Sequence, residues 1–519
     1  MPVVGIDLGT TYSAVATLDD RGQPVTLPNR DGDMLTPSAV LLLDDGSAVV
    51  GQAALDVAQE QPECVATLVK RRMGLESFGR LVTGREFRPE TLSAIILRKL
   101  IQDAEQRLGP ISKAVITVPA YFDDTRRKAT HDAGRIAGLD VLDILDEPTA
   151  AALAYSFQRG NAVPSAQATL TDRPQTVLVY DLGGGTFDVT VVKLLPKRFQ
   201  VLAIEGDVRL GGKDWDDRLV NHVAHAFRTQ FGADPREDPQ SLAILQAAAE
   251  RAKRTLSKLD QASVTVNHAG HKLVVPIARK EFEGLTRDLL TRTRLTTQQV
   301  LRQAGLGWEQ IDRVLLVGGS THMPMTGALL NELSGRPVDS TLAVSEVVAR
   351  GAAIHAGILS ARSPNSGAMS VAAVDALADV VEINVNAHSL GIEVRKDAER
   401  ANDVLIPKNT QLPAASSRVY YTMAENQSKV RVRVLQGEAV QADACIAVGE
   451  CWIDGLPPTL PKGAPVQVRC AVAANGLIDV MALDMTSGRM ARAEIHRSSG
   501  LSNDEIAREA NWVNGLRIQ

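Results

Sequence analysis

The chain has 519 residues, enough for three or four domains of typical size, and its 45% apolar and 23% charged residues exclude a mainly disordered protein. Acidic and basic residues number 61 and 56, so the basic excess of a broad nucleic-acid-binding surface is missing. No apolar run approaches the ~20 residues of a membrane span, and no signal peptide is recognisable. We therefore expect a cytoplasmic protein without nucleic-acid or membrane partners.

Two distant segments share one pattern, in which a strand and an Asp-Leu-Gly sequence precede a turn of small residues and a second strand. They are Gly5-Ile-Asp-Leu-Gly-Thr-Thr-Tyr-Ser-Ala-Val15 and Val179-Tyr-Asp-Leu-Gly-Gly-Gly-Thr-Phe-Asp-Val189. Their separation is far longer than the ~20–50 residues of a solenoid repeat. The pattern predicts two duplicated lobes.

Between and after these segments, apolar strands alternate with amphipathic helices. A strand at 114–118 ends at Pro119, a helix follows Asp123 or Asp124, and another helix begins at Glu147. Helical spacing recurs at 242–259, and a strand at 313–317 runs into a Gly-Gly turn. This alternation predicts an α/β fold with mixed sheets up to about residue 360.

The pattern then changes. Residues 360–379 are rich in Ser, Ala, Asn and Gly, as in linkers, and the apolar period falls to two beyond them. Asn475-Gly476, between two alternating runs, predicts a hairpin. We expect an all-β domain at 386–497 and one short helix in the last residues.

Glycine turns at strand ends expose several backbone amides that attract phosphate oxygens. A single Asp-Leu-Gly turn is also a common hairpin, but two matched copies and the Gly318-Gly319 turn favour a triphosphate site. Asp7 and Asp181 are the carboxylates expected to hold a hydrated Mg²⁺, which needs only one or two of them. Thr186 and Asp188 are suited to orienting an attacking water.

Five motifs together resemble the DnaK-type heat-shock protein 70 chaperones, and the likeness covers nearly the whole chain. They are Asp7-Leu-Gly-Thr-Thr-Tyr-Ser13, Asp146-Glu-Pro-Thr-Ala-Ala-Ala152, Asp181-Leu-Gly-Gly-Gly-Thr-Phe-Asp188, Glu250-Arg-Ala-Lys-Arg-Thr-Leu-Ser257 and Leu316-Val-Gly-Gly-Ser-Thr321. Ser389-Leu-Gly-Ile-Glu393, Val404-Leu-Ile-Pro-Lys-Asn-Thr410 and Val434-Leu-Gln-Gly-Glu438 extend the likeness into the β region.

The resemblance implies an actin-like ATPase domain at 1–360, made of two ribonuclease H-like lobes. Lobe I covers about 1–175 and lobe II about 176–360. A linker at 361–385, a β-sandwich peptide-binding domain at 386–497 and a short helix at 498–519 in place of the family's helical lid would follow.

The resemblance also assigns nucleotide-site residues. The residues expected to bind ATP or ADP are Thr10, Thr11, Tyr12, Gly183, Gly184, Gly185, Glu250, Lys253, Arg254, Ser257, Gly318, Gly319 and Ser320. Lys70 matches the family's catalytic lysine, and Mg²⁺, with K⁺ as an optional companion, would accompany the nucleotide. Pro119, Arg127 and Glu147 match a relay to the peptide domain, and Glu147 also counts among the catalytic residues.

For the β domain, the resemblance implies a groove that holds extended apolar polypeptides. The matching positions are Ile392, Val394, Tyr420, Met423, Val430 and Val432. An ordinary sandwich core would show the same periodicity, so the residues alone leave both interpretations open. A J-domain cochaperone and a nucleotide exchange factor are the further partners that the family implies.

Three departures from the family pattern stand out. The stretch between Lys70 and Leu92 is short, Asp143 replaces a basic residue, and Glu382 lies in a linker that is normally apolar. Asp143 would weaken binding to an acidic cochaperone surface, and Glu382 would need a partner on docking.

An ATP-hydrolysing chaperone is the leading function. The alternatives are a small-molecule kinase of the same fold, an actin-like filament protein, and a specialised chaperone relative with one dedicated client.

Overall fold

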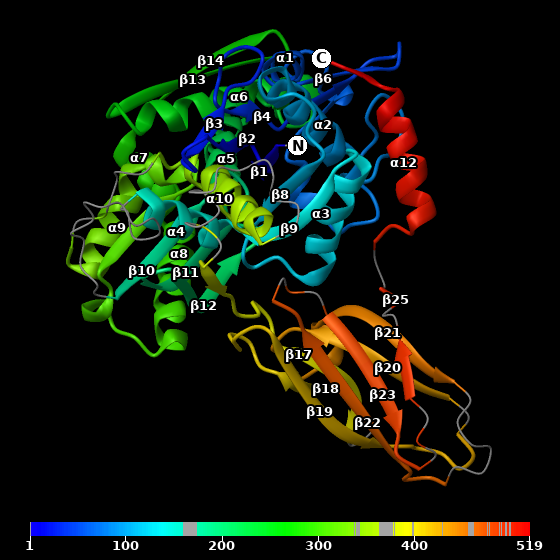
Figure 1. The fold of residues 1–519 in the computed structure, drawn as a ribbon. Helices are drawn as coiled ribbons and strands as arrows, with labels where there is room; N and C mark the ends of the chain where they lie inside the picture. The colour runs from blue at the N-terminus through cyan, green and yellow to red at the C-terminus, as the bar shows by residue number, and fades with distance from the viewer. Residues whose placement is uncertain are drawn as a thin grey trace.

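The computed structural model of the chain describes residues 2–158, 174–336, 338, 343–362, 377, 379–396, 399–427, 429–454, 461–474, 476, 478–486, 488, 490–493, 496–497 and 500–519. Most of the expected linker, and Asn475 of the expected hairpin, lie outside the described residues. Figure 1 shows a mixed α/β body above a β-rich part that begins after the linker. We keep the names lobe I and lobe II for the residue ranges given above.

The main sheet of lobe I has the spatial order β3 (Pro24–Leu27), β2 (Tyr12–Leu18), β1 (Val3–Asp7), β8 (Lys113–Val118), β9 (Asp140–Asp146). β1 is antiparallel to β2 and parallel to β8, and β8 is parallel to β9. The helices of this lobe are α1 (Gln52–Val57), α2 (Pro89–Leu108), α3 (Asp124–Ile136) and α4 (Glu147–Gln158). The carboxyl ends of β1, β8 and β9 therefore point the same way.

The sheet of lobe II repeats this arrangement. Its order is β15 (Arg313–Val317), β10 (Gln175–Leu182), β11 (Phe187–Leu195), β12 (Arg198–Asp207), β16 (Val381–Ile383). Here β10 is antiparallel to β11 and parallel to β15. Its helices are α5 (Gly212–Phe231), α6 (Pro239–Leu256), α7 (Arg279–Leu285), α8 (Arg287–Ala304), α9 (Pro324–Ser334) and α10 (Val347–Ala361), with a hairpin of β13 (Gln261–His268) and β14 (His271–Ala278).

Helix α10 packs against α4 and the main sheet of lobe I, and α4 in turn packs against β10 and β11 of lobe II. A Cβ on Gly5 of β1 would lie 2.1 Å from the amide nitrogen of Ala353, and one on Gly351 would lie 1.8 Å from the carbonyl oxygen of Ala150 in α4. Only glycine permits such close backbone approaches. Buried side chains from α4, β10 and α10 form one apolar core that joins the lobes.

The β-rich part contains two sheets that share one apolar core. The first has the order β18 (Glu399–Ile406), β17 (Leu390–Lys396), β20 (Lys429–Gln436), β21 (Ile446–Asp454), β25 (His496–Arg497); the second is β19 (Ala414–Tyr421), β22 (Pro465–Val472), β23 (Ile478–Asp484), β24 (Met490–Ala493). Along β22, Val466, Val468, Cys470 and Val472 are buried. The period-two pattern therefore places one face of this strand in the core.

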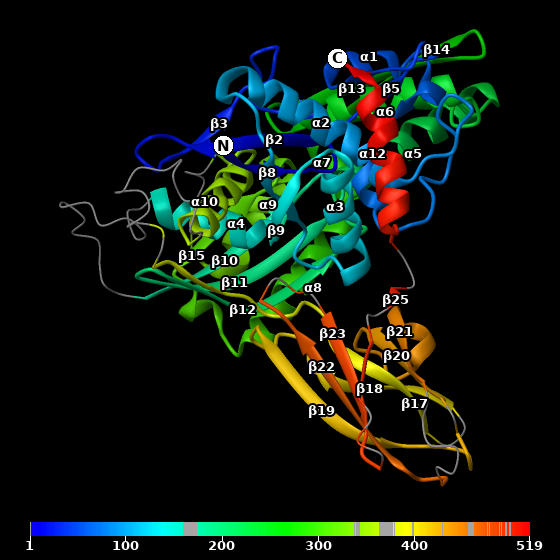
Figure 2. The same ribbon diagram turned by 45° about the vertical axis from the view of Figure 1, so that its right-hand side comes forward.

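The last residues return to lobe I, as Figures 1 and 2 show. Helix α12 (Asn503–Gly515) starts with a capping box in which the Ser502 hydroxyl accepts from the amide of Glu505. The side chains of Ile506 and Val513 are buried in the same core as α2. Beyond the helix, β26 (Arg517–Ile518) adds a parallel strand to the small sheet of β6 (Ser47–Val50), β5 (Val40–Leu42) and β7 (Val65–Ala66).

The helix at the chain's end thus packs on the shortened part of lobe I. The Trp512 and Phe87 ring centroids are 5.5 Å apart, and the Arg85 guanidinium lies 4.4 Å from the Trp512 ring. The Thr91 hydroxyl donates to Glu509 Oε2 at 2.8 Å.

Among the described helices, none is long and apolar enough to cross a membrane.

Candidate functional site

The two glycine turns predicted to hold phosphates face each other in direct contact. A Cβ on Gly184 would lie 2.6 Å from the Thr11 hydroxyl oxygen, and one on Gly185 would lie 2.6 Å from Cγ2 of Thr10. The turn of lobe I is fixed by Ser13, whose hydroxyl accepts from the amide of Gly9 at 3.2 Å. The duplicated motifs therefore meet between the lobes, and any larger residue at these glycines would force them apart.

Three aspartates gather behind these turns, of which Asp181 and Asp188 are buried and Asp7 is half-buried. Asp7 ends β1 and accepts from the Thr117 hydroxyl at 3.2 Å, while Asp181 and Asp188 are cross-strand partners in β10 and β11. Burial, followed by the charge of Glu147, raises the pKa of Asp7 to about 7. The same two causes raise the pKa values of Asp181 and Asp188 well above the usual range. Without a bound cation, the site therefore disfavours the ionised form of all three carboxylates.

The cation facing this cluster is Lys70, in the short helix η2 (Val69–Arg72). Its ammonium forms an ion pair with Glu147 Oε1, and both residues are buried. Glu147 starts α4 directly after β9, and its charge acts on all three aspartates as well as on Lys70. One buried cation that is already paired leaves the aspartates uncompensated.

That missing counter-charge fits a divalent cation. No group of three or more His, Cys, Asp or Glu side chains among the described residues forms a ready-made metal cage. Mg²⁺ keeps several waters and uses one or two carboxylates together with substrate phosphates, so such a cage is not required. Asp7 and Asp181 are suited to hold the ion through water.

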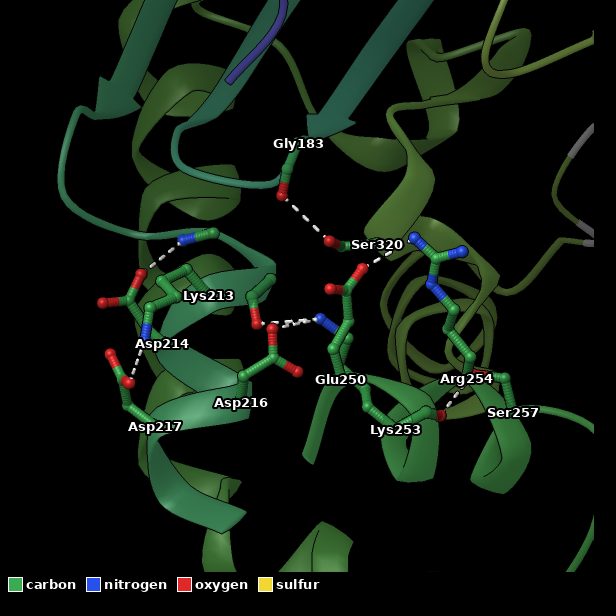
Figure 3. Close-up of polar contacts among 12 residues, drawn as sticks. Gly183, Lys213, Asp214, Asp216, Asp217, Glu250, Lys253, Arg254, Ser257 and Ser320 are labelled. Carbon is green, nitrogen blue, oxygen red and sulfur yellow. Dashed lines mark hydrogen bonds and ion pairs between the residues drawn. The ribbon is translucent and has the colours of Figure 1, made fainter. Parts of the chain in front are cut away.

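One face of α6 presents charged residues that are expected to bind ATP or ADP, as Figure 3 shows. Lys253 Nζ donates to the Gly212 carbonyl at 3.0 Å and pairs with Asp216 at 2.8 Å. Burial raises the pKa of Asp216 to about 6 despite the attraction of Lys253. The Ser257 hydroxyl donates to the Lys253 carbonyl at 3.2 Å.

The third glycine turn joins this group. Helix η4 (Gly319–His322) begins after Gly318, whose positive φ of 81° favours glycine. The Ser320 hydroxyl donates to the Gly183 carbonyl at 2.9 Å, and a Cβ on Gly212 would lie 2.4 Å from that hydroxyl oxygen. The turns at 183, 211 and 318 therefore converge on one place in lobe II.

Two polar contacts connect the lobes across the turns. Arg254 donates to the Tyr12 hydroxyl at 2.8 Å, stands 5.4 Å from that ring's centroid, and pairs with Glu250 at 2.6 Å. Arg71 pairs with Asp214 at 2.8 Å.

Our sequence reasoning missed Asp214 and Asp216, although the Gly-Gly pair before their helix was an available signal.

The residues assigned to a relay form a continuous chain of contacts. Arg127 pairs with Asp146 and donates to the Phe122 carbonyl at 3.2 Å. Asp146 immediately precedes Glu147, the partner of Lys70. Pro119 follows β8, and its carbonyl accepts from the amide of Phe122 at 3.1 Å. The relay residues are thus brought together with the carboxylate cluster.

Further contacts lead from the lobes to the β-rich part. The Tyr121 and His388 rings lie 4.3 Å apart, and the Tyr121 amide donates to Asp188 at 3.0 Å. Lys408 pairs with Glu205 at 2.9 Å, with both side chains buried. Tyr121 therefore touches both an aspartate of the cluster and the β-rich part.

The six positions assigned to a peptide groove lie in different surroundings. Ile392 and Val432 are buried in the sandwich core, with Tyr420 and Val430 packed against it. The Tyr420 hydroxyl donates to Asp403 at 2.8 Å. Val394 is half-buried, and Met423 is 60% exposed. The structure brings four of the six together in one cluster, and the groove stays a prediction.

Comparisons with known proteins agree with this architecture. A sequence model of the family described as "Hsp70 protein" matches residues 3–80 and 77–514. The chain belongs to the Hsp70 family. It is 41% identical over 513 residues to a protein named "Chaperone protein DnaK" from Halobacterium salinarum, with 97% of this chain and 76% of that protein covered. It is also 41% identical over 535 residues to "Chaperone protein dnaK3" from Thermosynechococcus vestitus, covering 97% and 74%. Hsp70 proteins are ATP-dependent chaperones, so the kinase and filament alternatives are not favoured.

Proposed function

We propose that this chain hydrolyses ATP between lobes I and II and uses the cycle to bind and release apolar polypeptide segments in its β-rich part. The observation that carries the proposal is the contact of the two Asp-Leu-Gly turns beside a cluster of three aspartates, two of them buried. That arrangement supplies backbone amides for phosphates and uncompensated carboxylates for a cation. The actin-like, duplicated form of the two lobes belongs to the same proposal.

In this mechanism Mg²⁺, held through water by Asp7 and Asp181, would neutralise phosphate charge. Lys70 stabilises the charge that develops on the transferred phosphoryl group, as phosphoryl transfer requires. Thr186 and Asp188 orient the attacking water, and Glu147 holds Lys70 in place through their ion pair. Asp188 also accepts from the Tyr121 amide, which fixes its carboxylate. K⁺ as a further ion stays a prediction.

The nucleoside end is assigned to α6. Lys253 and Ser257 reach the same side of that helix, and Glu250 with Arg254 closes it toward Tyr12. The Gly318–Ser320 turn is joined to the phosphate turn of lobe II by the bond from the Ser320 hydroxyl to the Gly183 carbonyl. Binding would thus engage both lobes at once, which explains why the residues come from both.

The β-rich part would hold an extended client against β17 and β20, where backbone bonds tolerate many sequences and pockets favour apolar side chains. Arg127 pairs with Asp146 and donates to the carbonyls of Ala120 and Phe122 on either side of Tyr121. The Tyr121 ring lies near that of His388, and these contacts support coupling between the two activities. A J-domain cochaperone and an exchange factor are partners by analogy with the family.

The test is ATP turnover measured with and without a short hydrophobic peptide. Stimulation by the peptide, but not by a charged peptide of equal length, supports both sites and their coupling. Turnover without any peptide effect would leave an uncoupled ATPase. ATP turnover that depends on an added sugar, and not on a peptide, would revive the kinase alternative.

A further inference from the structure

A histidine with two carboxylate partners lies where the linker meets the lobes. His355 of α10 places Nδ1 2.9 Å from Glu382 Oε1, and its Nε2 lies 2.9 Å from Asp143 Oδ2. The exposed fractions of the three side chains are only 9% for His355, 11% for Glu382 and 18% for Asp143. The three residues come from β9, α10 and β16, so one imidazole joins three separate elements.

The charges in this cluster complement each other. Burial alone would lower the pKa of His355, but Glu382 and then Asp143 oppose it and raise the pKa to about 10. The imidazole is therefore protonated at neutral pH, and both ring nitrogens donate. Asp143 and Glu382 are the two acidic residues that depart from the family pattern, and both have His355 as their partner.

The backbone contacts of the same linker segment are few. Strand β16 pairs with β12 over only three positions, from Arg198 opposite Val381 to Gln200 opposite Ile383. The Val381 amide donates to the Lys197 carbonyl at 2.8 Å, and Val381 itself is 46% exposed. A strand this short needs side-chain support to stay paired. Val380 and Ile383 supply apolar burial, and Glu382 supplies a charge.

We propose that His355 clamps the linker strand β16 to the lobes through its ion pair with Glu382, while Asp143 orients the imidazole and keeps it charged. Release of the strand then requires a buried ion pair to be broken, whereas a purely apolar linker would lose only packing. The clamp itself is independent of the ATPase. Strand β9 carries both Asp143 of the clamp and Asp146, which pairs with Arg127 of the proposed relay. A link between linker docking and the ATPase cycle through β9 therefore rests on the proposed function.

The test is amide hydrogen exchange of residues 381–383 in the full chain. His355→Gln leaves two buried carboxylates without a cation, so we expect exchange at these amides to rise about tenfold or more. The triple variant His355→Gln, Asp143→Asn, Glu382→Gln removes the clamp and also the unpaired carboxylates, so its exchange should fall between that of His355→Gln and that of the parent. That partial rescue distinguishes lost charge pairing from a lost shape.

Asp379→Asn is the matched control. Asp379 lies in the same segment and pairs with Lys197 at 2.9 Å, but its side chain is 71% exposed, so exchange should not change. If His355→Gln does not fold, Glu382→Gln serves instead and should raise exchange in the same amides. Unchanged exchange in the folded His355 or Glu382 variant, or an equal rise in the Asp379 variant, would overturn the clamp.

ATP turnover recorded on the same samples separates the two claims. Absence of turnover in the parent protein would remove the proposed function and leave the exchange result unaffected. A parent protein that hydrolyses ATP while its His355 variant exchanges normally would contradict the clamp alone.

Discussion

Lys70 and Glu147 form an ion pair in which both side chains are buried, although 76 residues separate them in the chain. Glu147 is also the neighbour of Asp146, which pairs with Arg127. The peptide bond between Asp146 and Glu147 therefore joins two ion pairs, one with Lys70 at the aspartate cluster and one with Arg127. This connection gives the proposed coupling a physical route.

We predict that Lys70→Ala retains nucleotide binding but slows single-turnover hydrolysis about 100-fold or more, because it removes the cation that stabilises the transferred phosphoryl group. Rapid-quench measurement of bound ATP checks this. Arg72→Ala is the control, because Arg72 lies on the same short helix with an exposed side chain. Hydrolysis at the parental rate would remove Lys70 from the mechanism.

Tyr12→Phe should speed the release of bound ADP about two- to tenfold, because it deletes the hydroxyl that accepts from Arg254 and keeps the ring and backbone. Dissociation of a fluorescent ADP analogue in stopped flow measures the effect. Arg251→Ala, an exposed change on the same helix, should leave release unchanged. Equal release rates for Tyr12→Phe and the parent would show that this contact does not close the site.

Linker docking should also depend on pH. Both partners of His355 are acidic, with Glu382 on β16 and Asp143 on β9, and Asp146 lies further along β9. Since the pKa of His355 rises from 6.5 to about 10, its contribution is complete below pH 6.5 and is lost as the pH rises through about 10. Exchange at residues 381–383, corrected for intrinsic alkaline acceleration, should therefore increase near pH 10.

The neutral triple variant controls for this pH dependence, because it has no group at the clamp that titrates there. Its corrected exchange should stay flat over the same range. A parallel increase in that variant would assign the loss to another group.

The helix after the β-rich part should stabilise lobe I. Trp512→Ala should lower the free energy of unfolding of the α/β body by about 2 kcal/mol, because a half-buried indole is lost from its contacts with Phe87 and Arg85. Chemical denaturation followed by circular dichroism tests this. Arg508→Ala, exposed on the same helix, should change the value by less than about 0.5 kcal/mol. Equal effects of the two substitutions would show that the helix adds no specific packing.

Local patterns predicted much of the fold because each leaves its own signature. The two Asp-Leu-Gly turns and the alternation along β22 are visible in the residues themselves, and so is the cap of α3, which the residues narrow to Asp123 or Asp124 and which is Asp123 in the structure. They place the aspartates at strand ends, where the structure has them. Whether an inward-facing strand residue lines a groove or fills a core is harder to predict, because both give the same period of two. The groove positions Ile392 and Val432 could therefore not be distinguished from residues of an ordinary core.

Long-range pairs could not be predicted in the same way. His355 is a single histidine in an apolar helix, and nothing near it in the chain marks it as the partner of Asp143 and Glu382. Likewise, the short helix at 503–515 was expected, but its packing against Phe87 and Thr91 depends on contacts more than 400 residues away in the chain. Such contacts follow from the fold as a whole.

The most direct test of the central claim is a calorimetric titration of the purified full chain with ADP and Mg²⁺. We predict saturable heat with one nucleotide bound per chain, and weaker binding when Asp7 and Asp181 are both replaced by Asn. No detectable heat, or binding that is indifferent to magnesium and to both aspartates, would contradict a nucleotide site between the two lobes.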